Sequence, residues 1–205
     1  MDAVLETYEA ADFALWPVAD PPAERLLTLS GDLSPLEVGT AVAALACYND
    51  APGEHRSPES GVELLHRLAS AETVIAPGGL RIRDTTTGVT VEPGCCFGLE
   101  NWRDWLGLLD GEEPWLGHDP TPGVEYAGPL VRLWPDAERL PPGPAIELPL
   151  TDLPGLLTSV RAHLTGFLGL VEQWAAPDVP AALTARLVAK LDESLTATAP
   201  LGAAG

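Results

Sequence analysis

The residues best suited to chemistry begin with two adjacent thiols, Cys95 and Cys96. They follow Pro93-Gly94, at the point where a strand-like pattern gives way to helical spacing. A cysteine near a helix N-terminus loses its proton more readily, because exposed amide groups favour a thiolate. The pair therefore indicates a nucleophile, a redox pair or soft metal ligands. The alternative is two small, reduced side chains packed at a turn.

A second candidate lies in the loop Gly117-His118-Asp119-Pro120. An imidazole beside a carboxylate binds metal or moves protons, whereas the simpler interpretation is an Asp that starts a turn. Zinc sites take four ligands in all, with cysteines usually two to four residues apart. Neither pair completes such a site by itself, so we expect no cofactor. The sequence also has no P-loop, no G-x-S-x-G elbow and no H-E-x-x-H motif, so we expect no catalytic residue. If the protein does hold a metal, the expected ligands are Cys95, Cys96, His118 and Asp119.

Tryptophans form the third candidate. Trp102 and Trp105 share one face of a predicted helix, and Trp115 follows in a stretch rich in Pro and Gly. Tryptophan dominates many binding hot spots, although such rings equally form the core beneath a loop. As a binding surface, the segment would use three aromatic and four acidic side chains: Trp102, Trp105, Trp115, Glu100, Asp104, Glu112 and Glu113.

The charge balance bears on partners. The chain has 30 Asp and Glu against 11 Lys and Arg, a formal net charge of −19. This field repels phosphate backbones and anionic lipids, so we expect no nucleic-acid and no membrane binding. It attracts a basic protein partner, although acidic surface also serves solubility alone. Three cysteines make no disulfide framework and no apolar signal run opens the chain, so we expect a cytoplasmic protein.

The segment Pro93–Trp105 (PGCCFGLENWRDW), followed by Pro114–Pro120 (PWLGHDP), resembles part of a group of small uncharacterised proteins of GC-rich bacteria. It is also similar to immunity proteins that neutralise polymorphic toxins. The resemblance implies a protein that acts by binding, with its acidic surface set against a basic toxin.

These candidates need a scaffold, and hydrophobic spacing predicts a single α+β domain over residues 1–199. A small antiparallel sheet of about four to five strands should pack with N-terminal and C-terminal helices. The predicted helices cover 2–15, 35–49, 58–71, 97–109, 153–174 and 179–197. The predicted β structure is a hairpin over 79–92 and strands over 73–76, 130–134 and 145–148. Residues 200–205 are predicted to be a disordered tail.

The leading hypothesis is an acidic binding protein of the immunity type, which occludes a basic partner and performs no catalysis. The alternative is a small enzyme, or a metal, redox or ligand sensor, built around Cys95, Cys96 and His118. A third is a dimeric structural scaffold. The alternative requires the thiols and the imidazole to meet in space, which sequence spacing does not decide.

Overall fold

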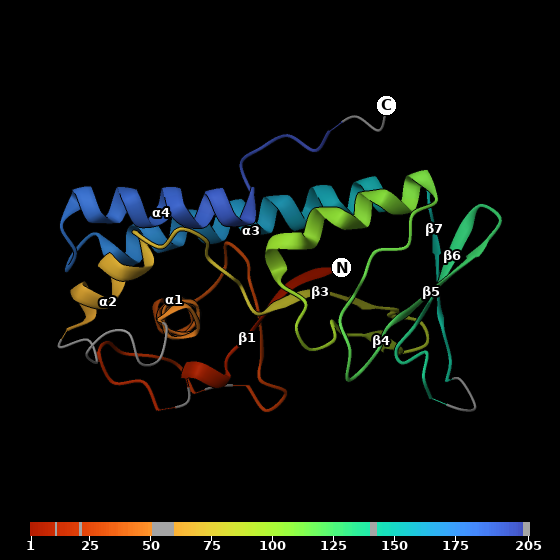
Figure 1. Cartoon of the computed structure of the whole chain (residues 1–205), viewed down its shortest axis with the longest axis horizontal. Coiled ribbons are helices and arrows are strands. Elements are labelled where there is room, and N and C mark those ends of the chain that lie inside the picture. Colours follow the sequence, from red (N-terminus) through yellow and green to blue (C-terminus); the bar gives the residue numbers. More distant parts are fainter. Residues whose placement is uncertain (11, 21, 51–59, 140–142, 203–205) are drawn as a thin grey trace.

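The structure, a computed structural model of the 205-residue chain, describes every residue except 11, 21, 51–59, 140–142 and 203–205. Helices α3 (Leu153–Ala175) and α4 (Ala181–Leu195) lie along one long side of the molecule (Figure 1). Of two small antiparallel sheets, the four-stranded one lies below these helices in Figure 1 and the three-stranded one lies at the right-hand end of the molecule. The predicted α+β class is confirmed, with two sheets in place of one.

The first sheet has the strand order β2-β1-β3-β4, and all neighbours are antiparallel. Its strands are β2 (Leu26–Thr28), β1 (Asp2–Glu6), β3 (Gly78–Arg83) and β4 (Thr90–Val91). The predicted hairpin over 79–92 is confirmed by the pairing of β3 with β4, with Ile82 opposite Val91. Its turn is closed by the Gly88 N–H, which donates to the Asp84 carbonyl at 2.8 Å.

The predicted helix over 2–15 is wrong. The chain forms strand β1 there and then the short 3-10 helix η1 (Tyr8–Ala10). Ala3, Val4 and Leu5 have no exposed surface, as expected of a central strand that is covered on both faces. A continuous apolar run fits helical spacing as well as strand spacing, so periodicity alone does not distinguish the two.

The predicted strand over 73–76 is also wrong. Ala76 bonds instead to the start of the 3-10 helix η2 (Leu99–Asp110). Its N–H donates to Glu100 Oε2 at 2.9 Å, and its carbonyl accepts the N–H of Leu99 at 2.7 Å. Helix η2 is the element predicted as a helix over 97–109, and the extended segment before β3 is held by it rather than by a strand.

The second sheet contains both of the predicted later strands. They are β6 (Leu130–Trp134) and β7 (Ile146–Pro149), with β5 (Gly123–Ala127) as the third member in the order β5-β6-β7. Strand β5 was not predicted, because Gly and Pro on both sides of it indicate a loop. The turn to β6 uses Gly128 at φ +68°, a conformation that favours glycine.

The remaining helices follow the predicted pattern. Helix α1 (Pro35–Asn49) starts with the predicted capping box, in which Ser34 and Glu37 bond to each other's backbone N–H groups. Helix α2 (Gly61–Leu68) lies inside the predicted 58–71, whose first two residues are outside the described part of the chain. None of the described helices has the length and apolar character needed to cross a membrane.

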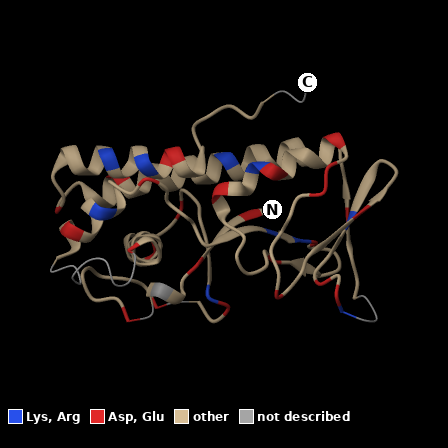
Figure 2. Ribbon diagram, in the orientation of Figure 1, with Lys and Arg blue, Asp and Glu red and all other residues tan. Residues whose placement is uncertain are grey.

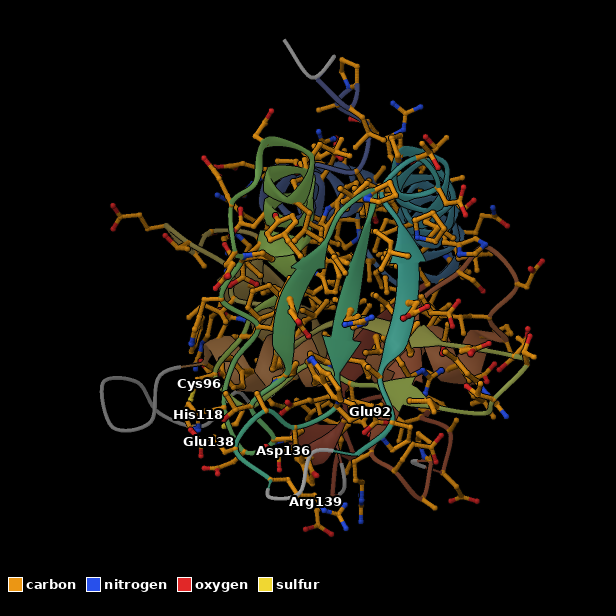
Figure 3. The ribbon with its side chains drawn as sticks, turned by 90° about the vertical axis from the view of Figure 1, so that its right-hand side faces the viewer. Glu92, Cys96, His118, Asp136, Glu138 and Arg139 are labelled. Carbon is orange, nitrogen blue, oxygen red and sulfur yellow. The ribbon has the colours of Figure 1, made fainter. Side chains whose placement is uncertain are left out.

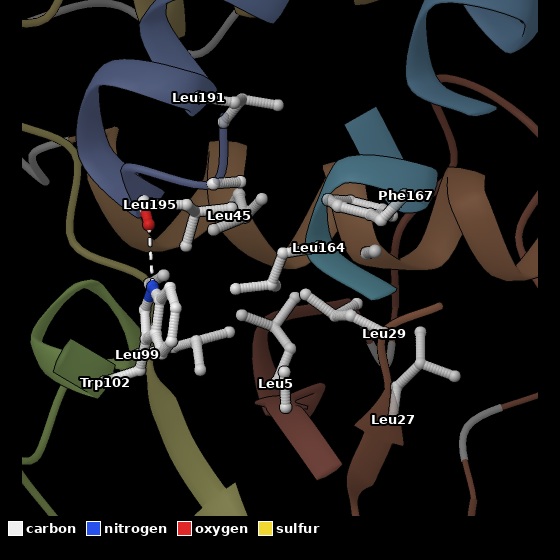
Figure 4. Close-up of a cluster of buried hydrophobic side chains, with 14 of the residues drawn as sticks. Leu5, Leu27, Leu29, Leu45, Leu99, Trp102, Leu164, Phe167, Leu191 and Leu195 are labelled. Carbon is white, nitrogen blue, oxygen red and sulfur yellow. Dashed lines mark hydrogen bonds between the residues drawn. The ribbon is translucent and has the colours of Figure 1, made fainter. Parts of the chain in front are cut away.

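A core of leucines joins the helices to the first sheet, and Trp102 fills its edge (Figure 4). The Trp102 indole N–H donates to the Leu195 carbonyl at 2.7 Å. Beside it, the Arg103 guanidinium donates to three further carbonyls, those of Thr196, Ala199 and Pro200. The prediction of a disordered tail from residue 200 is therefore wrong at Pro200, while 203–205 lie outside the described residues.

Candidate functional site

Two loops bring the predicted thiols and imidazole together at one edge of the molecule, where Figure 3 shows Cys96 beside His118. The loops are joined by backbone hydrogen bonds. The Gly94 N–H donates to the Leu116 carbonyl at 2.8 Å, and Cys95 and His118 exchange a pair of bonds at 2.5 and 3.2 Å. This backbone pairing holds the two loops close together.

Glycine allows that close approach. A Cβ atom added at Gly94 would lie 2.5 Å from the His118 backbone nitrogen, and one at Gly117 would lie 2.5 Å from the Gly94 carbonyl oxygen. Gly117 also has φ +95°, which side chains rarely adopt. Gly94 and Gly117 therefore have a structural reason for being glycine, and together they set the position of the thiols against the imidazole.

The thiol–imidazole site consists of Cys95, Cys96 and His118. One ligand atom from each, the two Sγ atoms and a ring nitrogen, lies within 4.8 Å of the others, and all three residues are exposed. The two sulfurs are 3.4 Å apart. His118 Nδ1 lies 3.2 Å from Asp119 Oδ2, so the carboxylate orients the ring. The sequence presents two separate candidates, and the fold makes them one.

The Cys95 thiol does not have the lowered pKa that the sequence suggests. The hydrogen bond with Cys96 raises the pKa of the Cys95 thiol, and so do burial and the negative charges of Cys96 and Glu6. Helix η2 begins only at Leu99, so Cys95 is not at its N-terminus. The expectation of a lowered thiol pKa is therefore wrong for Cys95, and this disfavours a nucleophilic role for that residue.

Negative groups from other elements face the site. Tyr48, at the end of α1, is 44% exposed, whereas helical spacing places it on the buried stripe of that helix. Burial is the largest cause of the raised pKa of Tyr48, and smaller contributions come from the negative charges of Cys96, Glu6, Cys95 and Glu100. Burial also raises the pKa of Glu6, at the end of β1. Sequence reasoning missed Tyr48 and Glu6, because nothing local connects them to the thiols.

The three tryptophans separate into two groups. Trp102 and Trp105 are 0% and 1% exposed, so they belong to the core and a partner cannot reach them. The interpretation of these two as binding anchors is wrong, because η2 packs that face against β3 and α4. Trp115 is 58% exposed and so stays accessible to a partner. The centroid of its ring lies 6.1 Å from that of the Phe97 ring.

The predicted acidic set divides in the same way. The Glu100 carboxylate accepts the Ala76 N–H and is half-buried, so it stabilises the fold. Asp104, Glu112 and Glu113 are exposed. Burial raises the pKa of Tyr126, and a negative cluster adds to this effect: Glu113, Glu112 and Asp110.

Basic charge is scarce around this acidic run. Between Asp104 and Val131 the chain has six acids and no Lys or Arg. Elsewhere, basic side chains already pair with acids, as in Arg67 with Asp50 at 3.0 Å and Lys190 with Glu193 at 2.7 Å. Figure 2 shows the result, with few and scattered basic positions among many acidic ones.

The geometry suits a soft cation. A tetrahedral zinc ion with Zn–S bonds of about 2.3 Å places two sulfurs about 3.8 Å apart. The observed 3.4 Å between the Cys95 and Cys96 sulfurs needs only a small side-chain rotation to match this. Three protein ligands leave one position open to solvent, as in sites that exchange a ligand rather than closed structural sites.

No protein-family model, no curated protein and no solved structure matches this chain. The geometry of the site therefore carries the functional proposal.

Proposed function

We propose that the protein binds a soft metal ion, Zn²⁺ or Cu⁺, through Cys95, Cys96 and His118. One observation carries the proposal: ligand atoms from loops more than twenty residues apart in sequence converge within 4.8 Å. Thiolate ligands select Cu⁺ and Zn²⁺ among the common metals, and imidazole suits both zinc and copper.

The surroundings support a cation at this position. The Asp119 carboxylate beside His118 Nδ1 orients the ring and leaves Nε2 available as the ligand, an arrangement common at metal-bound histidines. The backbone pairs between Cys95 and His118 hold the ligands in place before the ion arrives. Because all three ligand residues are exposed, we assign the site to reversible metal binding, in sensing or transfer, within a reducing cytoplasm.

The test is a titration of the reduced protein with Co²⁺, a coloured substitute for zinc, followed by displacement with Zn²⁺. We expect one ion per chain and a sulfur-to-cobalt absorption band. Cys95→Ser, Cys96→Ser and His118→Gln should each weaken binding at least tenfold. Cys47→Ser is the matched control, since Cys47 lies in α1 outside the site. Unchanged stoichiometry and affinity in Cys96→Ser would sink the proposal.

A second candidate function is binding of a basic protein partner, with occlusion of its surface and no catalysis by this chain. Trp115 favours it, because this large ring is exposed and follows the acids Glu112 and Glu113 in a stretch of sequence without basic residues. One exposed anchor with an acidic rim replaces the three anchors expected from the sequence.

The measurement is paired capture from a host lysate at low ionic strength, with wild type and Trp115→Ala side by side. A specific partner should be retained by wild type and lost by the variant. Glu112→Gln with Glu113→Gln should flatten the salt dependence of its association rate. Equal retention of the partner by wild type and by Trp115→Ala would contradict a binding surface around Trp115. Dimerisation stays a separate prediction, which sedimentation velocity checks.

A further inference from the structure

A pocket lies at the C-terminal end of α3, where that helix meets the segment that follows η1. Its cavity is about 200 Å³, and its walls are mainly apolar. The residues that define this Trp pocket are Leu15, Trp16, Val62, Trp174, Asp178 and Val179. The Trp16 and Trp174 rings meet edge-on, with centroids 5.4 Å apart and an interplanar angle of 71°.

The Trp16 ring is fixed in place by its neighbours. Its indole N–H donates to the Gly39 carbonyl at 2.9 Å, and Phe13 packs against it with ring centroids 4.3 Å apart. A Cβ atom at Gly61 would lie 2.8 Å from Trp16 Cε3, so the ring occupies the space that glycine leaves at the start of α2. These contacts hold one wall of the pocket rigid, which lowers the entropic cost of binding a ligand.

Three features of the pocket favour positive charge. Two indole rings, those of Trp16 and Trp174, line it, and indole rings attract cations. Helix α3 ends at Ala175, so the negative end of its dipole points into this region. The carboxylate of Asp178 adds a full negative charge at the lining. Among the described residues that line the pocket there is no Lys, Arg or His to oppose them.

We propose that the Trp pocket binds a small alkylated ammonium ion, the chemistry of the choline headgroup. Hydrophobic walls and aromatic faces accept methyl groups, whereas a strongly hydrated ammonium or metal ion would lose more solvation than apolar walls return. The cavity of about 200 Å³ is smaller than the ~300–1,000 Å³ of sites for drug-sized ligands, so it fits a headgroup rather than a large molecule.

The experiment compares choline with its uncharged carbon isostere, 3,3-dimethylbutan-1-ol, by calorimetry and by NMR of the indole N–H signals. We expect choline to bind at least tenfold more tightly and to shift the signals of Trp16 and Trp174. Equal affinity for the isostere, or no shift of these two signals, overturns the proposal. Cys96→Ser should bind choline like wild type, which separates this pocket from the metal proposal.

A charge variant and its control sharpen the test. Asp178→Asn should remove most of the preference for choline over the isostere. Asp152→Asn, at the N-terminal end of the same helix, makes the same change of charge and should leave the preference intact. Both residues are exposed, so both variants should fold. Phosphatidylcholine vesicles distinguish the source: cosedimentation without any response to free choline contradicts a small-molecule site.

Discussion

The helix η2 and the loops on either side of it form one continuous stretch of sequence, yet they do different work. Helix η2 buries Trp102 and Trp105 and bonds to the end of α4. The flanking loops expose Cys95, Cys96 and His118 and hold each other through backbone bonds. Rare residue types gather in both regions, so their presence marks packing as readily as it marks a site. Burial is what distinguishes the two.

The largest expected effect tests η2. Trp102→Ala leaves a cavity in the core and removes the hydrogen bond to the Leu195 carbonyl, so we expect it to lower the free energy of unfolding by about 3–5 kcal/mol. Urea denaturation measures this loss. A loss below about 1 kcal/mol would show that η2 is not a core element.

Next in size is Gly94→Ala. The added Cβ atom meets backbone of the partner loop, which cannot give way, so we expect a loss of about 2–3 kcal/mol in stability and of Co²⁺ binding altogether. Gly155→Ala in α3 is the control, since its Cβ atom meets nothing within 4 Å and should stabilise the helix by up to about 1 kcal/mol. Normal Co²⁺ binding by Gly94→Ala would show that the metal site does not depend on the backbone pairing of the two loops.

Acid should weaken metal binding at the thiol–imidazole site without unfolding the protein. Each thiol that binds a metal must lose its proton, and the pKa of Cys95 is raised, so the proton competes strongly with the metal. Co²⁺ affinity should therefore rise with pH and fall by at least tenfold per unit between about pH 8 and pH 6. Choline affinity should stay flat over this range, because no Cys or His is among the described residues that line the Trp pocket.

The smallest effect belongs to Trp115→Ala. Although it removes a tryptophan, the ring is 58% exposed, so we expect a change in unfolding free energy within about 0.5 kcal/mol. The same denaturation experiment that measures Trp102→Ala provides the comparison. A loss that approaches the Trp102 value would mean that both tryptophans are structural, and the partner surface would lose its anchor.

Much of the fold is predictable because it depends on local chemistry. Ser34 and Glu37 specify the start of α1, and leucines at helical spacing specify α3 and α4. Strand β1 is missed because its three buried residues have no period, and β5 because its flanking glycines indicate a loop.

The site is only half predictable, for a different reason. The thiols and the His-Asp pair are conspicuous as residue types, but their meeting depends on a backbone pairing between Cys95 and His118 that has no local signal. The Trp pocket has even less, since Trp16 and Trp174 are separated by most of the chain and join only through the packing of α3 on the N-terminal segment.

The hydrogen bonds from Trp102 and Arg103 to the end of α4 have a consequence for folding during protein synthesis. These side chains bond to carbonyls 93 to 97 residues further along the chain. While the ribosome is still making α4, the indole and guanidinium donors have none of these acceptors, and the edge of the core that Trp102 fills stays open to water. This part of the core can therefore close only after α4 and the residues up to Pro200 have been translated, and a nascent chain should remain a substrate for chaperones until then.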